Sequence, residues 1–177
     1  LTLAFEIIAD ENYKISSNLK NDIIKSLAFC SGHTGIAGGQ ELDLKFENKK
    51  KNLKQIIDMQ KKKTGKLFHF CLYAASIIAN RNKKEKKLFS VIGEEIGLLF
   101  QFADDFLDIK GSKKLMGKPT KKDDKKGKST IINLMGYNKA FMYANNLKKN
   151  ILRKLKKHGK NATDLTNTIE FILGRNF

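Results

Sequence analysis

Hydrophobic residues recur at helical spacing along most of the chain, three or four positions apart, which places them on one face of an α-helix. Segments with the strict alternation of a β-strand are absent, and clusters of glycine or charged residues separate the periodic stretches. We therefore expect one all-α domain without an internal repeat or linker. The expected helices are 18–29, 53–63, 67–78, 88–109, 131–135, 137–157 and 163–173, after an apolar first segment at 1–9.

The first segment, Leu1–Ala9, is apolar nearly all round, and no helix-capping residue precedes it. A helix of this composition is typical of a protein interior rather than of a chain end. We therefore expect further residues upstream of Leu1, and we expect apolar faces on this chain that those residues would cover.

Composition favours a folded globular protein, because 41% of the residues are hydrophobic and 30% are charged. The net charge of +17 is typical of proteins that bind nucleic acid or anionic membranes. Of the 35 basic residues, however, 32 are Lys, whereas direct reading of DNA bases depends heavily on Arg. Lys, Asn and Ile all have AT-rich codons, so we interpret the charge as mainly compositional and expect no specific nucleic acid partner.

Cysteine usage predicts a reducing, cytoplasmic environment, with Cys30 and Cys71 as thiols of the core. The three histidines lack the spacing of metal ligands. The longest mostly apolar stretch, 67–79, is shorter than the roughly 20 residues that a membrane span needs. We therefore expect no membrane span, and no signal peptide is visible.

The longest expected helix ends in an acidic segment. Asp104 and Asp108 are four residues apart and share a helix face with Gly97 and Gln101, whereas Asp105 stands about 100° round. Their like charges repel each other, and carboxylates near a helix C-terminus oppose the helix dipole. A divalent cation would relieve both penalties, and hard carboxylate oxygens suit Mg²⁺. The alternative is an acidic surface turn that is paired with lysines.

The segment after this helix, 110–128, is expected to be a basic loop that contains glycine. Its lysines include Lys118, Lys125, Lys126 and Lys128. Lysine binds phosphate as a point charge, and Mg²⁺ commonly binds one or two carboxylates together with substrate phosphates. Acids and lysines around one pocket therefore favour a site for a Mg²⁺–diphosphate.

Five motifs in order carry a resemblance to a known family. They are Gly-Gly-Gln-Glu-Leu-Asp-Leu at 38–44, Lys-Thr-Gly-Lys-Leu at 63–67, the acidic helix at 96–108, the loop from Gly117-Lys118 to Gly127-Lys128-Ser129-Thr130, and Gly-Arg-Asn at 174–176. Together they resemble the trans-isoprenyl diphosphate synthases, specifically the bacterial type of farnesyl diphosphate synthase. The resemblance implies that residues 1–177 are the C-terminal part of a single polyprenyl synthase domain, a helical bundle around a central cavity whose N-terminal helices lie upstream.

The resemblance also implies a Mg²⁺-dependent prenyltransferase, usually a homodimer, which condenses isopentenyl diphosphate with an allylic diphosphate. The expected metal ligands are Asp104, Asp105 and Asp108, with Asp123 as an outer carboxylate in the loop. The expected residues for the allylic diphosphate are Lys63, Lys118 and Lys128. Thr64 and Gln101 match residues that face the developing cation and the reacting tail, so we expect Lys63, Thr64 and Gln101 to act in catalysis. Gln40 and Asp43 match polar residues that line the cavity.

Several parts of the family pattern lie upstream of Leu1 by this comparison, namely the first aspartate-rich motif, a segment that helps bind isopentenyl diphosphate, and the position that sets chain length. The 177 residues alone are therefore expected to be inactive. The expected product is farnesyl diphosphate, with geranylgeranyl diphosphate as the alternative. Two other interpretations stay open, a basic helical module for nucleic acid or membranes and an inactive partner subunit.

Overall fold

The computed structural model describes residues 1–116 and 130–175. No strand occurs among these residues, so the expected all-α class is confirmed. The elements are α1 (Thr2–Ala9), α2 (Ser17–Ser31), α3 (Ile36–Phe46), α4 (Leu53–Gln60), the π-helical turn η1 (Lys61–Gly65), α5 (Lys66–Ile78), α6 (Lys83–Met116), α7 (Ile131–Met135), α8 (Tyr137–Leu155), the 3₁₀ segment η3 (Lys156–Ala162) and α9 (Thr163–Gly174).

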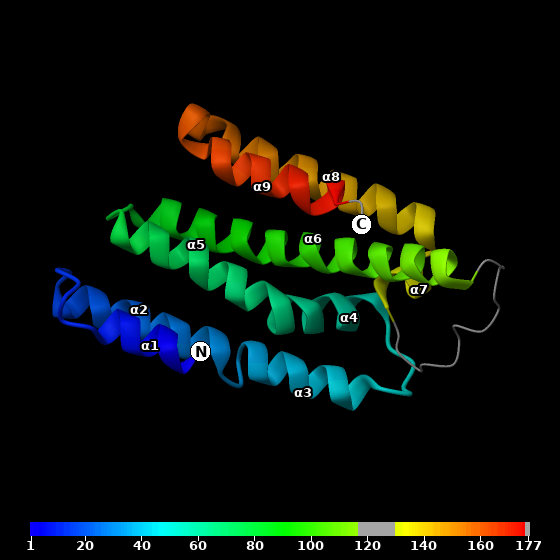
Figure 1. Ribbon diagram of the computed structural model, residues 1–177, viewed down its shortest axis with the longest axis horizontal. Coiled ribbons are helices and arrows are strands. Elements are labelled where there is room, and N and C mark those ends of the chain that lie inside the picture. The colour runs from blue at the N-terminus through cyan, green and yellow to red at the C-terminus, as the bar shows by residue number, and fades with distance from the viewer. Residues whose placement is uncertain (117–129, 176–177) are drawn as a thin grey trace.

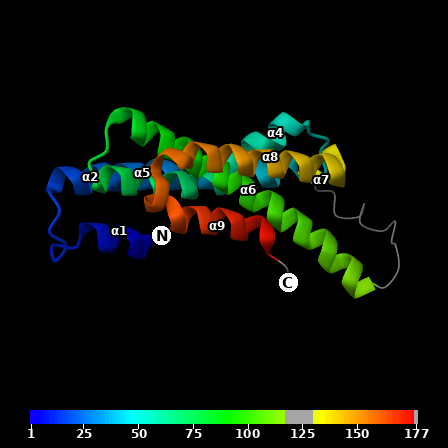
Figure 2. The same ribbon diagram turned by 90° about the horizontal axis from the view of Figure 1, so that it is seen from above.

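Helix α6, which has 34 residues, runs through the middle of the molecule. It packs against α5 on one side and against α8 and α9 on the other, and α2 lies beyond α5 (Figure 1 and Figure 2). Its fully buried side chains include Ile92, Leu98, Leu99 and Phe102. Burial of each such side chain contributes about 1.5–3 kcal/mol, so the helix that bears the carboxylates is firmly seated in the core.

Two glycine contacts bring three backbones together around η1. A Cβ atom on Gly97 of α6 would lie 2.5 Å from the Cα atom of Gly65, and one on Gly39 of α3 would lie 2.2 Å from the backbone nitrogen of Lys63. Only glycine permits such approaches. The helix expected to stop before Gly65 instead continues into α5 through the π-helical turn, a feature that is frequent at functional sites. The turn places Lys63 and Thr64 between α3 and α6.

Caps explain where several helices begin. Helix α6 is longer than expected at both ends. At its start, the Asn82 side chain accepts a hydrogen bond from the Glu85 amide at 3.0 Å, which begins the helix early. Helix α2 is capped by Ser16 rather than by Asn18. Thr130, which was one of two candidates for this position, caps α7.

The two cysteines differ in their surroundings. Cys30 on α2 is buried, and burial raises the pKa of its thiol. Cys71 is exposed, so the expectation of two core thiols is wrong for this residue. The reason is that α5 turns Ala74 and Ile77 toward its neighbours and leaves Cys71 on an uncovered side.

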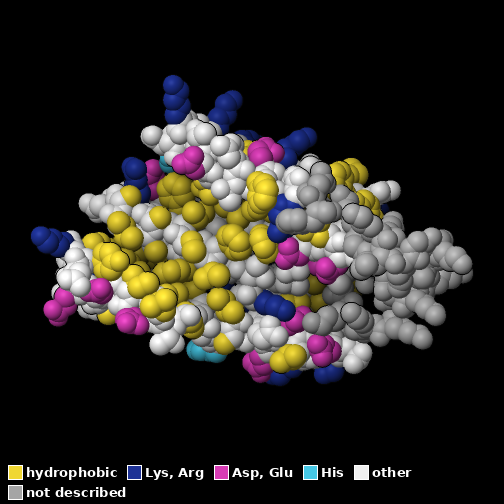
Figure 3. All heavy atoms as spheres, in the orientation of Figure 1, with side chains coloured by type: hydrophobic (Ala, Val, Ile, Leu, Met, Phe, Trp, Pro, Cys, Tyr) yellow, Lys and Arg dark blue, Asp and Glu magenta, His cyan; other side chains and the backbone are white. Residues whose placement is uncertain are grey.

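One face of the molecule is strongly apolar. Figure 3 shows hydrophobic side chains gathered between α9 and the pair α1 and α2. Helix α1 contains no buried residue, and Leu1, Leu3 and Ile7 are all exposed, which agrees with the apolar faces expected for this segment. Among the helices that the structure describes, none is long and apolar enough to cross a membrane.

Candidate functional site

The three carboxylates of α6 occupy three different environments. Asp105 is buried, Asp108 is exposed, and the Asp104 side chain is 40% exposed. With about 100° of rotation per residue, Asp104 and Asp105 lie on either side of the line that joins Gln101 and Asp108. The packing of other helices therefore decides which of the two faces which neighbour.

Asp105 lies on the side of α6 toward α3, α4 and α7, where it lines a cavity. The Gln101 side chain donates a hydrogen bond from Nε2 to Asp105 Oδ1 at 2.9 Å. Burial raises the pKa of Asp105 to about 6; the hydrogen bond from Gln101 opposes the rise, and the charges of Asp108 and Asp104 add to it. The Asp105 carboxyl group therefore keeps its proton to a higher pH than an ordinary aspartate does.

Asp104 lies on the opposite side, toward the end of α9. Arg175 Nη2 donates to Asp104 Oδ1 at 2.9 Å, and the guanidinium stacks 4.6 Å from the centre of the Phe100 ring. The Arg175 Nε group also donates to the Ile172 carbonyl at 3.2 Å. The sequence pattern included Arg175 only as part of a terminal motif, because nothing local to α6 or α9 reveals a partner 71 positions away.

Lys63 and Asp43 form an ion pair across the junction of η1 and α3. Lys63 Nζ lies 2.7 Å from Asp43 Oδ2, and the Asp43 side chain is only 9% exposed, whereas that of Lys63 is 30% exposed. The close contact of Gly39 with the Lys63 backbone holds the two elements at this distance. Lys63 thus has its ammonium group fixed at the cavity rather than free in solvent.

A cavity of about 200 Å³ is lined by Asp105 on one side and by the Lys63–Asp43 ion pair on the other. It brings together five of the residues expected from the sequence, which come from α3, η1 and α6: Asp43, Lys63, Gln101, Asp105 and Asp108. The rest of its lining is Phe46, Glu47, Ile56, Met59, Gln60 and Thr130. Lys63 can contact an anion in this cavity, and the two α6 carboxylates, Asp105 and Asp108, face a cation that bridges the anion to the acids.

Other expected residues do not line this cavity. Gln40 is exposed on α3, Thr64 is half-buried in η1, and Asp104 faces α9. The face that joins Gln101 and Asp108 to the cavity therefore includes Asp105 rather than Asp104, contrary to the expected stripe. The expected positions in the loop, Lys118, Asp123 and Lys128, lie outside the described residues.

The carboxylates of α6 suit Mg²⁺ only if a diphosphate and water supply its remaining ligands. Within residues 1–116 and 130–175, no three His, Cys, Asp or Glu side chains converge to hold a metal by themselves. Mg²⁺ usually takes one or two carboxylates and completes its six oxygen ligands with water and phosphate. Asp104 and Asp108 are exposed enough to serve in this way, so the donor set fits a cation that binds together with a diphosphate.

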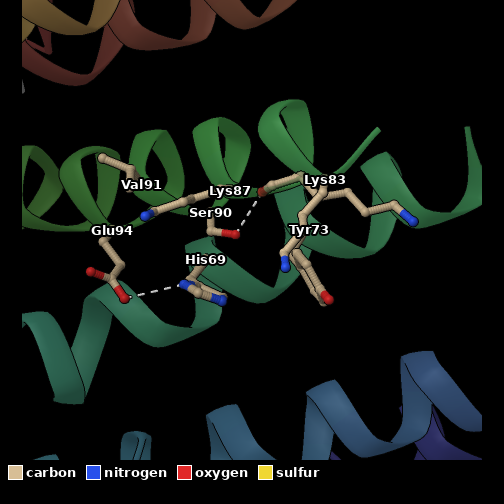
Figure 4. A pocket seen from close by; sticks show the side chains of 8 residues that line it. His69, Tyr73, Lys83, Lys87, Ser90, Val91 and Glu94 are labelled. Carbon is tan, nitrogen blue, oxygen red and sulfur yellow. Dashed lines mark hydrogen bonds and ion pairs between the residues drawn. The ribbon is translucent and has the colours of Figure 1, made fainter. Parts of the chain in front are cut away.

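A larger cavity of about 540 Å³ opens between α5 and α6, away from these carboxylates (Figure 4). Glu94 accepts from Lys66 and contacts His69 at 3.1 Å there, and the hydrogen bond to His69 and the Lys66 charge hold the pKa of Glu94 at about 2. Lys83, Lys86 and Lys87 also line this larger cavity. None of the expected site residues lies here, and we place the functional site at the smaller cavity.

Comparison with known proteins identifies the family of the chain. The polyprenyl synthetase family model matches residues 2–170. A farnesyl diphosphate synthase of Micrococcus luteus is 35% identical over 136 residues, which are 77% of this chain and 46% of that protein. The chain thus spans about half the length of the curated relatives it matches.

Two solved structures share the fold. A FPP/GFPP synthase of Zymomonas mobilis superposes with a TM-score of 0.82 at 32% identity, over 97% of this chain and 57% of that one. A geranyltransferase of Helicobacter pylori, solved with magnesium and isoprenyl diphosphate, has a TM-score of 0.77 at 30% identity and covers 98% and 56% of the two chains. The fold, the family match and the arrangement of acids and lysine together show that this chain belongs to the polyprenyl synthetase family.

Proposed function

We propose that these residues form the diphosphate- and metal-binding half of a Mg²⁺-dependent trans-prenyltransferase. In this proposal the whole enzyme condenses isopentenyl diphosphate with dimethylallyl or geranyl diphosphate to give farnesyl diphosphate. The observation that supports it most is the cavity in which Lys63, fixed by Asp43, faces the carboxylates of α6. A cation and acids so arranged suit an anionic substrate that arrives with a metal ion.

The residues divide the work between binding and ionisation. Lys63 contacts the diphosphate, and Asp43 holds the ammonium group in place. When Mg²⁺ is bound by Asp104 and Asp108, it stabilises the charge that develops on the leaving diphosphate. Gln101 orients Asp105 through their hydrogen bond and presents its amide to the reacting tail. Thr64 and Gln40 are proposed to contact substrate only in the complete, liganded enzyme.

The loop residues Lys118, Lys128 and Asp123 complete the proposal. The two lysines would add positive charge for the same diphosphate, and Asp123 would support the metal ligands from outside. The proposed enzyme is a homodimer. A geranylgeranyl diphosphate synthase of Cyanophora paradoxa is also 28% identical over 177 residues, so geranylgeranyl diphosphate stays the alternative product.

Asp104→Ala tests the metal site in the complete enzyme. The assay measures formation of prenyl diphosphates from isopentenyl and geranyl diphosphates at saturating Mg²⁺. We expect turnover to fall by about 100-fold, because metal sites are sensitive even to loss of outer partners, and we expect a smaller defect for Asp108→Ala. Asp22→Ala, an exposed carboxylate on α2 far from the site, is the matched control. Near-normal turnover of Asp104→Ala would refute the metal-site proposal.

A further inference from the structure

We propose that Arg175 is an internal counter-ion of the metal site. Its guanidinium pairs with Asp104 while no metal is bound, and a divalent cation that arrives with a diphosphate displaces it. The inference rests on the proposed function, because it assumes that Asp104 ligates a metal. It adds the residue that follows the C-terminus of α9 to expected site residues that otherwise come from α3, η1 and α6.

Three contacts hold the Arg175 guanidinium at Asp104. Besides the 2.9 Å ion pair, the group lies over the Phe100 ring and donates from Nε to the Ile172 carbonyl. The Arg175 side chain is only 12% exposed. A planar guanidinium that is stacked and hydrogen-bonded in this way loses little further freedom on pairing with a carboxylate, so the pair is preorganised.

The Arg175–Asp104 pair offsets part of the negative charge at the acidic end of α6. Among the described residues, Asp104 is the only one of the three acids with an ion-pair partner, since neither Asp105 nor Asp108 has one there. The three like charges lie on one helix end, where they repel each other and oppose the helix dipole. Arg175 therefore lowers the electrostatic cost of the acidic cluster when the metal is absent.

The same contact must weaken metal binding. A cation on the Asp104 carboxylate would lie beside the guanidinium, and two positive charges at such a distance repel strongly in a partly buried site. Linkage requires that each cation lowers the affinity for the other by the same factor. A diphosphate changes the balance, because the displaced guanidinium can pair with a phosphate oxygen that is bound to the same metal.

Arg175→Gln separates these effects, with Mn²⁺ as the probe and electron paramagnetic resonance as the readout in the complete protein. Without diphosphate, we expect the variant to bind Mn²⁺ about fivefold more tightly than the wild type. With inorganic pyrophosphate, we expect the variant to bind the Mn²⁺–pyrophosphate pair more weakly than the wild type. Arg175→Lys keeps the charge and should restore the weak Mn²⁺ binding. Arg153→Gln, an exposed arginine on α8, controls for net charge.

The outcomes distinguish this inference from its alternatives. If Arg175 only stabilises the end of α9, Arg175→Gln will lower the melting temperature without changing the Mn²⁺ affinity, and the proposal is overturned. An equal gain in affinity for Arg153→Gln, or no Mn²⁺ binding by any of these proteins, also overturns it. A wild-type protein that shows the exchange but forms no prenyl diphosphate would instead refute the proposed function.

Discussion

Gly97→Ala is expected to destabilise the protein by pushing α6 away from the π-helical turn. The new Cβ atom would lie 2.5 Å from the Gly65 Cα atom and 3.1 Å from Cδ2 of Phe68. Carbon atoms in contact normally stay about 3.5–4.0 Å apart, so the methyl group overlaps its nearest neighbour by about 1 Å. That neighbour is a backbone atom, which cannot rotate away as a side chain can.

The size of the effect follows from two opposing contributions. Overpacking of this kind costs about 1–3 kcal/mol, whereas alanine in place of glycine in a helix interior gains about 1 kcal/mol. Because the methyl group meets a backbone atom that cannot move aside, we expect a net loss of about 1–2 kcal/mol in the free energy of unfolding. For a chain of 177 residues this corresponds to a fall of about 2–8 °C in melting temperature.

Urea denaturation followed by circular dichroism measures this change, and calorimetry gives the melting temperature. Gly174→Ala is the matched control, because a Cβ atom there would meet nothing within 4 Å. The control should change stability by no more than about 0.5 kcal/mol. The Gly97 variant should also bind pyrophosphate more weakly, since its displaced α6 carries Gln101 and Asp105 away from Lys63. A Gly97→Ala protein as stable as the wild type would show that the reasoning from this contact is wrong.

Two further predictions concern the charged groups of the cavity. Lys63→Ala should raise the KM for the allylic diphosphate about tenfold or more, since a hydrogen bond to a charged group contributes about 1.5–3 kcal/mol. Steady-state kinetics measure this, with Lys62→Ala as the control because the Lys62 side chain does not line the cavity. Equal KM values for the two variants would contradict the prediction. Burial raises the pKa of Asp105 from 3.8 to about 6, so the unfolded chain loses this proton first, and stability falls as the pH rises between these two values. Asp105→Asn, which cannot ionise, should therefore be more stable than the wild type by about 2–3 kcal/mol above pH 6 and equally stable below pH 4. Urea titrations at pH 4 and pH 7 measure this, and a difference that does not vary with pH would contradict it.

The helical class and most helix positions were predictable because they depend on local pattern. Hydrophobic spacing identified every helix from α4 onward, and Thr130 was recognised as a possible cap from its residue type alone. The start of α6 was missed although its signal is also local, in the spacing of Asn82 and Glu85. The π-helical turn was not predicted, because its extra residue per turn leaves no distinct mark in the hydrophobic pattern.

The candidate site was predictable as a set of residues but not as a geometry. Acidic spacing on one helix and the family motifs together selected five of the eleven residues that line the cavity. Helical spacing alone placed Asp104 beside Gln101. The rotation of about 100° per residue, however, puts Asp104 and Asp105 almost equally far from the line that joins Gln101 and Asp108. The packing of α3 and α7 on one side and of α9 on the other assigns Asp105 to the cavity and Asp104 to Arg175.

Sequence pattern therefore accounts for the features that depend on residues a few positions apart: helix type, most caps, and the acids and lysine that suit a metal-bound diphosphate. Packing accounts for the features that depend on residues far apart in the chain. Asp43 meets Lys63 only because glycine lets α3 touch η1, and Arg175 meets Asp104 only because α9 lies along α6. Ion pairs and burial respond to distances in space, and those distances are set when the whole core closes around α6.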